Sequence, residues 1–231
     1  SPDIFLDNIG SVTLNAGANM LGNLRGTVAN LSLAYTSSYL SADDYGHAKD
    51  VGPGRGYPNN SANCSGSGGS HGGRGADGYC TANARPYYDK AKTPSQMGSG
   101  GGSSWGATGG AGGGVIDLTV RGELRNTGYV TASGERGQNS VNGSTRGAGG
   151  GAGGTVHMRT GNLTGTGYFR ANGGDGGGTS NTYRGGGGGG GRVVVYFKTW
   201  SLTYPYNSAV LGGAGFNGRG DLGTLAFIGR G

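Results

Sequence analysis

Clustered carboxylates are the first place to look for catalysis or metal binding in this sequence. Asp43, Asp44 and Asp50 form the one cluster among only 12 acidic residues in a chain of 231. Because Ca²⁺ prefers carboxylate and carbonyl oxygens, these three residues are candidate metal ligands, although the EF-hand spacing is absent. No pair of carboxylates can be assigned as the acid and base of a glycosidase. We therefore assign no catalytic residues and no cofactor, and we expect a protein that is not an enzyme.

His71 is the most distinctive polar side chain, because it lies inside the glycine-rich stretch 68–75. A histidine there could bind a metal or act as a base, but metal sites need several ligands. The other two histidines, His47 and His157, are in unrelated segments. We therefore expect the His71 ring to hydrogen-bond the backbone and fix its loop, with ligand binding as the alternative.

Arginine is the main basic residue: the chain has 14 Arg and 4 Lys, and its net charge is +6. Four arginines adjoin glycine runs and are candidates to face a polyanion: Arg74, Arg146, Arg184 and Arg192. Acidic polysaccharide and silicate are polyanions that a basic surface would attract. Two other interpretations remain, namely arginine stems that cover apolar surface and an RGG-type nucleic-acid binder that stacks bases on tyrosines. The strand patterns and cysteines described below favour a secreted fold, so nucleic acid is the least expected partner.

The two cysteines, Cys64 and Cys80, are 16 residues apart. An even count without zinc-ligand spacing favours a disulfide over two free thiols, and closing this loop would stabilise the fold by about 3 kcal/mol. Five Asn-X-Ser/Thr sites add to the indications of secretion: Asn30, Asn59, Asn63, Asn142 and Asn162. No run of about 18 apolar residues occurs, so we expect no membrane span. Without a methionine or leader before Ser1, we interpret the chain as a mature, secreted, extracellular form.

Glycine dominates the composition, with 59 of the 231 residues. A helical bundle is excluded on this basis, because each interior helical glycine costs about 1 kcal/mol relative to alanine. The glycines do not recur at every third position, which excludes collagen. Plain disorder usually requires a high net charge, and +6 is small for a chain of this length.

The chain divides into three regions, which we expect to form a single domain spanning residues 1–231. Alternating apolar residues predict a β-strand opening over residues 1–40. Residues 41–108 are a long irregular segment, rich in Gly, Ser, Asn and Pro, that the disulfide would close. Residues 109–231 contain three glycine-rich β repeats.

The repeats are recognised by matching positions. Leu124 and Tyr129 recur at Leu163 and Tyr168, a shift of 39 residues, and a third copy follows the seven glycines 185–191. Each copy consists of a glycine run, a strand, a turn and a short second strand, and stacked copies can share one core. This pattern predicts an all-β fold, a β-solenoid-like stack of ~39-residue repeats. The glycine runs would form either polyproline-II-like strands or excursions at one side of the stack.

An ordered set of motifs resembles a known group of proteins. These motifs are GSGGSHGGRG at 66–75, GGAGGG at 109–114, GTGYFRANGG at 165–174 and GGGGGGGRVVVY at 185–196. Together they resemble the glycine-rich, β-helical extracellular repeat proteins, over about residues 50–231. The resemblance implies a secreted or surface location and a β-helical fold, and it implies no reaction.

These observations predict an extracellular structural protein that self-assembles into a filament, lattice or matrix. The apolar segment 223–229 lacks a charge that would prevent strand pairing with another copy. Such an assembly could be an organic scaffold for silica or for a polysaccharide. The alternative is a carbohydrate-binding or carbohydrate-cleaving β-helix, whose groove would be lined by aromatic residues. The candidates for that lining are Tyr57, Tyr79, Tyr87, Tyr88 and Trp105.

Overall fold

The regular elements that the structure describes are β-strands, so the expected all-β class is confirmed. The structure is a computed structural model. It describes residues 3–61, 63–80, 84–141, 146–178, 183–202, 208–216 and 218–230. Within these ranges, no helix is long and apolar enough to cross a membrane. The glycosylation candidate Asn142 lies outside the described residues.

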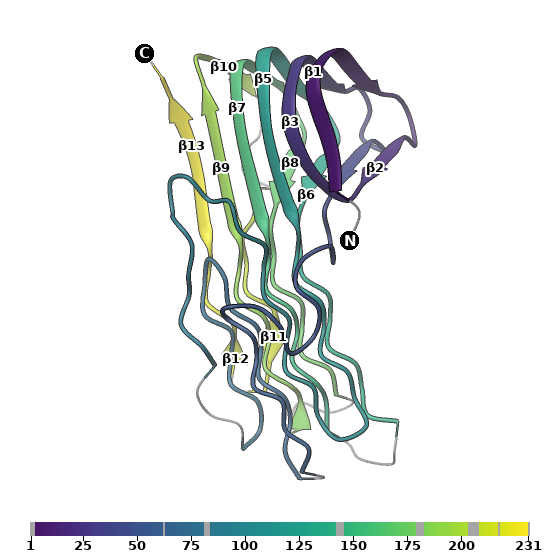
Figure 1. The fold of residues 1–231 in the computed structure, drawn as a ribbon, viewed down its shortest axis with the longest axis vertical. Helices are drawn as coiled ribbons and strands as arrows, with labels where there is room; N and C mark the ends of the chain where they lie inside the picture. Colours follow the sequence, from purple (N-terminus) through teal and green to yellow (C-terminus); the bar gives the residue numbers. More distant parts are fainter. Residues whose placement is uncertain are drawn as a thin grey trace.

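The larger sheet is parallel and has seven strands, which lie side by side across the upper half of Figure 1. Its order is β1-β3-β5-β7-β9-β13, and β10 pairs with β7 beyond the end of β9. The bounds are Asp3–Leu14 for β1, Asn23–Leu33 for β3, Val115–Asn126 for β5, Thr155–Gly165 for β7, Arg192–Phe197 for β9, Thr199–Leu202 for β10 and Thr224–Gly229 for β13. In several of these strands the side chains alternate in polarity, which buries one face of the sheet. In β5, Ile116 and Leu118 are buried while Asp117 and Thr119 are partly exposed.

The second sheet is also parallel and has four short strands in the order β2-β4-β6-β8. Their bounds are Asn19–Leu21 for β2, Tyr39–Ser41 for β4, Tyr129–Thr131 for β6 and Tyr168–Arg170 for β8. Val130 and Phe169 from this sheet are fully buried in an apolar core that both sheets share. In the sheets, residues matched by the 39-residue shift are direct partners: Leu124 pairs with Leu163 and Tyr129 with Tyr168.

Below the sheets in Figure 1, the chain continues as extended glycine-rich segments that lie alongside one another. Their backbone groups hydrogen-bond between segments: the N–H of Gly69 donates to Gly150 O at 3.0 Å, and the N–H of Gly73 donates to Gly190 O at 2.8 Å. Glycine is required by the close approach. A Cβ on Gly149 would lie 1.9 Å from the carbonyl oxygen of Ser67. The glycine runs are therefore packed backbone against backbone, with buried amides paired to distant carbonyls.

The β-solenoid-like stack of repeats predicted from the sequence is wrong. In a solenoid each repeat contacts only its neighbours along the chain. Here the Gly69 carbonyl accepts a hydrogen bond from Gly189 (2.9 Å), so the irregular segment lies among the glycine runs of the later copies. The spacing of strand partners is also unequal, since Leu24 pairs with Ile116 but Val193 pairs with Leu225. Parallel sheets and interleaved glycine segments replace the predicted stack.

The predicted disulfide between Cys64 and Cys80 is confirmed. It closes a loop within the irregular segment, whose described residues between β4 and β5 contain only isolated bridges. Near the other end of the chain, β11 (Ala214–Gly215) and β12 (Gly218–Arg219) form an antiparallel pair among the glycine segments.

Candidate functional site

The outer strands of the larger sheet, β1 and β13, each pair with a described strand on one side only. On β13, the N–H of Thr224 donates to Gly191 O (3.0 Å), and the N–H of Arg230 donates to Phe197 O (2.7 Å). Backbone groups of a strand point alternately to its two sides. The N–H groups of Leu225 and Phe227 therefore point away from β9, toward the open side.

Both outer strands expose apolar side chains. On β1, Phe5 is 65 % exposed and Ile9 is 43 % exposed. On β13, Leu225 is 41 % exposed, although its partner Val193 on β9 is fully buried. Leu225 is accessible because the buried row of side chains to which it belongs ends at the sheet edge.

The two edges are the opposite ends of the same buried rows. One row begins at Ile4, a second begins at Leu6, and they end at Leu225 and Phe227 respectively. The first row is Ile4, Leu24, Ile116, Val156, Val193 and Leu225. The second is Leu6, Gly26, Leu118, Met158, Val195 and Phe227. Each edge therefore presents apolar residues at matching positions of a parallel strand.

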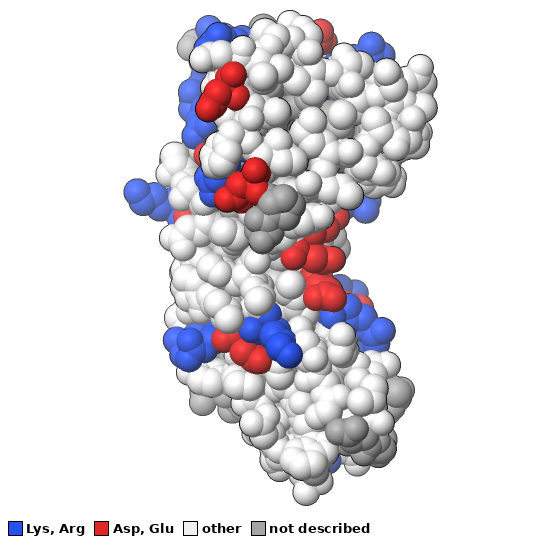
Figure 2. Space-filling view, turned by 45° about the vertical axis from the view of Figure 1, so that its right-hand side comes forward, with Lys and Arg blue, Asp and Glu red and all other residues white. Residues whose placement is uncertain are grey.

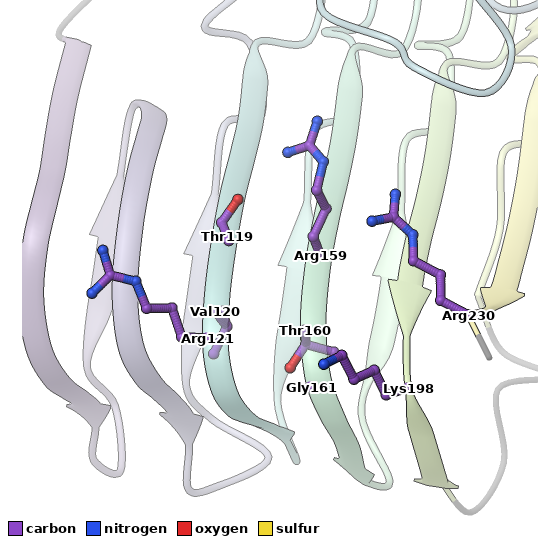
Figure 3. Close-up of a pocket in the computed structure, with 8 residues that line it drawn as sticks. All are labelled: Thr119, Val120, Arg121, Arg159, Thr160, Gly161, Lys198 and Arg230. Atoms are coloured by element: carbon purple, nitrogen blue, oxygen red, sulfur yellow. The ribbon is translucent and has the colours of Figure 1, made fainter.

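A second feature is a hollow of about 190 Å³ at the other face of the same sheet (Figure 3). Its lining is Thr119, Val120 and Arg121 from β5, Arg159, Thr160 and Gly161 from β7, Lys198 between β9 and β10, and Arg230 directly after β13. We call it the cationic hollow, because four of its eight lining residues carry a positive charge. Four separate segments of the chain contribute to it, and the parallel register brings them together.

The positive charge of the cationic hollow is only partly balanced. The guanidinium of Arg159 pairs with the Asp117 carboxylate at 3.1 Å, and Asp117 also lies 4.0 Å from Arg25. Arg230 stacks on the Tyr196 ring, 4.1 Å from its centroid, and Arg121 donates to the neutral Asn8 side chain. Among the described residues, no carboxylate pairs with Arg121, Lys198 or Arg230.

A buried histidine lies beside Arg159 and Asp117. His157 on β7 lies under the sheet surface, with its Nδ1 atom 3.4 Å from the Asp117 carboxylate. Burial, and then the positive charge of Arg159, lower the pKa of His157. Asp117 opposes this shift without overcoming it. Burial is the main cause of this shift, and the Arg159 charge adds to it.

The four arginines proposed from the sequence to face a polyanion are engaged elsewhere, and none lines the cationic hollow. Arg74 donates to Ala84 O and pairs with Asp77, and Arg184 donates to Gly176 O. Arg192 is buried and donates to the carbonyl of Tyr88 at 2.8 Å. Arg146 lies over the rings of Tyr79 and Tyr183, 4.3 and 4.1 Å from their centroids.

His71 is fully buried, and acceptors face both of its ring nitrogens. Nδ1 lies 2.9 Å from Gly153 O, and Nε2 lies 3.2 Å from the Asp89 carboxylate. The ring therefore lies between a backbone carbonyl of one glycine run and the Asp89 carboxylate. Burial raises the pKa of Asp89, but the hydrogen bonds from His71 and from three backbone N–H groups outweigh it and hold that pKa well below its usual range. His71 thus links the 84–97 segment to the glycine runs.

The carboxylates proposed as metal ligands do not converge. Asp50 accepts from the hydroxyl of Ser103 at 2.6 Å, while Asp43 accepts from the hydroxyl of Thr131 at 2.8 Å. Asp44 is near Asp43 and Glu135; partial burial, and then these two neighbours, raise its pKa to about 6. Within the described ranges, no group of three or more Asp, Glu, His or Cys residues is arranged to hold a metal ion.

The aromatic residues proposed to line a sugar groove have different environments. Tyr88 is inside the molecule, where its hydroxyl lies 2.8 Å from that of Ser99 and burial raises its pKa. Tyr79 packs edge-on against Phe216, whereas Tyr87 and Trp105 are exposed. The cationic hollow contains none of the five.

Sequence reasoning missed two groupings. Tyr39, Tyr129 and Tyr168 form a stack on the four-stranded sheet, with centroids 4.8 and 5.2 Å apart, and the recurrence of Tyr129 at Tyr168 was its only signal. The cationic hollow had no local signal, because its cations are far apart in the sequence.

Comparison of the chain with protein-family models, with curated proteins and with solved structures finds no match. The function is therefore inferred from the strand register, the exposed edges and the distribution of charge.

Proposed function

We propose that this is a non-enzymatic, extracellular structural protein that assembles edge to edge, through the two open edges of its seven-stranded sheet. The observation that carries the proposal is the pairing of the edges. The buried rows that end at Leu225 and Phe227 on β13 begin at Ile4 and Leu6 on β1. A second copy bringing its β1 beside β13 would continue both rows and would cover Leu225.

The direction of the strands favours this arrangement. All pairings within the larger sheet are parallel, so β1 of the next copy would run in the same direction as β13. The backbone N–H groups of Leu225 and Phe227 would then donate to carbonyl oxygens of the next copy. The edge strand β13 would no longer have unpaired backbone groups. Contacts between two different surfaces of the same molecule are heterologous, and they form open filaments when the rotation does not close a ring.

The distribution of charge also favours β1 of a second copy as the strand that pairs with the open side of β13. β1 carries two carboxylates, Asp3 and Asp7, whereas β13 has no charged residue and is followed by Arg230. In the register described above, Asp7 of the next copy would lie near the end of β13, close to Arg230. Opposite charges at this position would help to select the register.

The location and the matrix role are parts of the same proposal. A disulfide is typical of proteins in oxidising compartments, which supports a secreted protein. A filament of subunits with a net charge of +6 would attract a polyanionic matrix, and acidic polysaccharide and silica are the candidates.

The first test compares Leu225→Lys with the parent protein by sedimentation velocity and negative-stain electron microscopy over a range of concentrations. We expect the parent to form filaments whose length grows with concentration. We expect Leu225→Lys to stay monomeric, because a charge on the edge strand opposes pairing. Val141→Lys is the matched control: Val141 is 84 % exposed, lies outside both edge strands and should leave assembly unchanged. Monomers of the parent at every concentration, or equal assembly of both variants, would exclude the proposal.

A further inference from the structure

We propose that the cationic hollow is a binding site for a tetrahedral oxyanion, a sulfate or phosphate group. It lies mainly on a face of the larger sheet and is formed within one copy of the chain, although Arg230 directly follows the edge strand β13, so it is tested on the monomer. Within the described residues, its four cations have one carboxylate partner, the Asp117 side chain that pairs with Arg159. An anion between them would neutralise most of the remaining positive charge.

The cations of the cationic hollow are held in position by contacts that leave donors available. Asp117 pairs with Arg159, and the guanidinium of Arg230 lies over the Tyr196 ring. A guanidinium that is stacked on a ring keeps its N–H groups free at the edges, in the fork geometry that suits sulfate and phosphate. The fixed groups therefore need little ordering when an anion binds.

Gly161 and Lys198 form the lower part of the cationic hollow in Figure 3. The backbone N–H of Lys198 donates to Gly161 O at 2.9 Å, which anchors the lysine beside β7. Gly161 has no side chain, and the Lys198 side chain extends across this position. The Lys198 side chain is exposed, and no acceptor or carboxylate among the described residues pairs with it. The ammonium group is thus available to a ligand.

The size and the distribution of charge favour a small anionic group over an extended polyanion track. The cationic hollow has a volume of about 190 Å³, enough for one oxyanion with part of the molecule that carries it. Figure 2 shows Lys and Arg in separate groups on the face it presents, with Asp and Glu between some of them. A nucleic-acid groove would need a continuous basic stripe.

The test is titration calorimetry at low ionic strength and at a concentration where the protein is monomeric. The probes are sodium sulfate, sodium phosphate and a sulfated oligosaccharide, with sodium chloride as the reference. We expect saturable one-site binding of at least one probe, and a loss of affinity as salt is added. Binding of inorganic sulfate or phosphate would identify the free anion as sufficient. Binding of the sulfated oligosaccharide alone would identify a sulfate ester on a polysaccharide as the ligand.

The variant Lys198→Gln should weaken this binding by about tenfold, because it removes one charge-assisted hydrogen bond. Lys49→Gln is the matched control, since Lys49 is an exposed lysine outside the cationic hollow and its loss changes the net charge equally. Arg230→Gln is a second variant with the same expected direction, and thermal unfolding checks that each variant is folded. Absence of binding by all three probes, or equal weakening by Lys198→Gln and Lys49→Gln, would overturn the inference.

Discussion

Single buried polar residues hold the glycine runs to the rest of the chain. His71 is fully buried and connects Gly153 in one glycine run to Asp89 in the irregular segment. Asp89 also accepts from the backbone N–H groups of Ser95 and Gln96 at 3.0 and 3.1 Å. Because glycine has no side chain, one histidine ring here provides the lateral contact that a row of larger residues provides in an ordinary core.

Replacing His71 should be strongly destabilising. We expect His71→Leu to lower the free energy of unfolding by about 3 kcal/mol or more, because it leaves the Asp89 carboxylate buried without its partner. Chemical denaturation followed by circular dichroism measures the change. His47→Leu is the control, since His47 is only half-buried and should change the free energy by less than about 1 kcal/mol. Equal effects of the two substitutions would show that the His71 contacts do not stabilise the fold.

The charge of Asp44 should make stability depend on pH. Its pKa is raised to about 6 in the folded protein, above the unfolded value of about 3.9. Stability from this group is therefore present below about pH 4 and is lost as the pH rises through 6. Asp44→Asn should be more stable than the parent at pH 7, by less than about 1 kcal/mol because the group is exposed, and equal to it at pH 4.

The substitution is compatible with the backbone, because Asp44 has a φ of 64° and asparagine tolerates this left-handed region. Thermal unfolding at both pH values is the measurement, and Asp7→Asn on β1 is the control for a general loss of negative charge. A stability difference between Asp44→Asn and the parent that is the same at pH 4 and pH 7 would rule out this role.

At the scale of elements, the molecule joins two kinds of packing. The strands bury alternating Val, Ile and Leu side chains between two parallel sheets. The glycine segments bury peptide groups, which pair with peptide groups of segments far away in the sequence. An added methyl group should therefore have opposite consequences in the two parts.

Gly149→Ala tests the packing of the glycine segments. The new Cβ would lie 1.9 Å from the Ser67 carbonyl oxygen, so the segments must move apart. We expect a loss of about 2–3 kcal/mol or more of unfolding free energy, or a failure to fold. Gly10→Ala on β1 is the control, because a Cβ there meets nothing within 4 Å and alanine suits a strand better than glycine. It should leave stability unchanged or raise it by up to about 1 kcal/mol. Tolerance of Gly149→Ala would mean that these segments are not closely packed.

At the scale of the whole molecule, the sheet has a direction and two unlike edges. β1 and β13 lie at its opposite sides in Figure 1, so partners added at both edges would extend the protein along one axis. The cationic hollow would then recur once per copy along such a filament. The proposed assembly would in this way present an ordered row of anion sites from a single small site on each subunit.

The sequence by itself determined the local features of this protein. Alternating residues such as Ile116 and Leu118 predicted the strands, because the period of two is a property of a single extended segment. The pairing of Cys64 with Cys80, and the exclusion of a helical bundle by the glycine content, were equally accessible. The match of Tyr129 with Tyr168 also pointed to residues that are partners in the sheet.

Only the tertiary structure decided how these segments combine. A glycine run has no side chains to encode a partner, so the pairing of Gly69 with Gly150 and Gly189 could not be predicted from the sequence. The solenoid-like prediction failed for this reason. The cationic hollow depends on the register of several strands, which sets Thr119 beside Arg159 and brings Lys198 and Arg230 to the same face. Such long-range pairing is fixed by the packing of the whole chain, because every strand shift moves all of its side chains together.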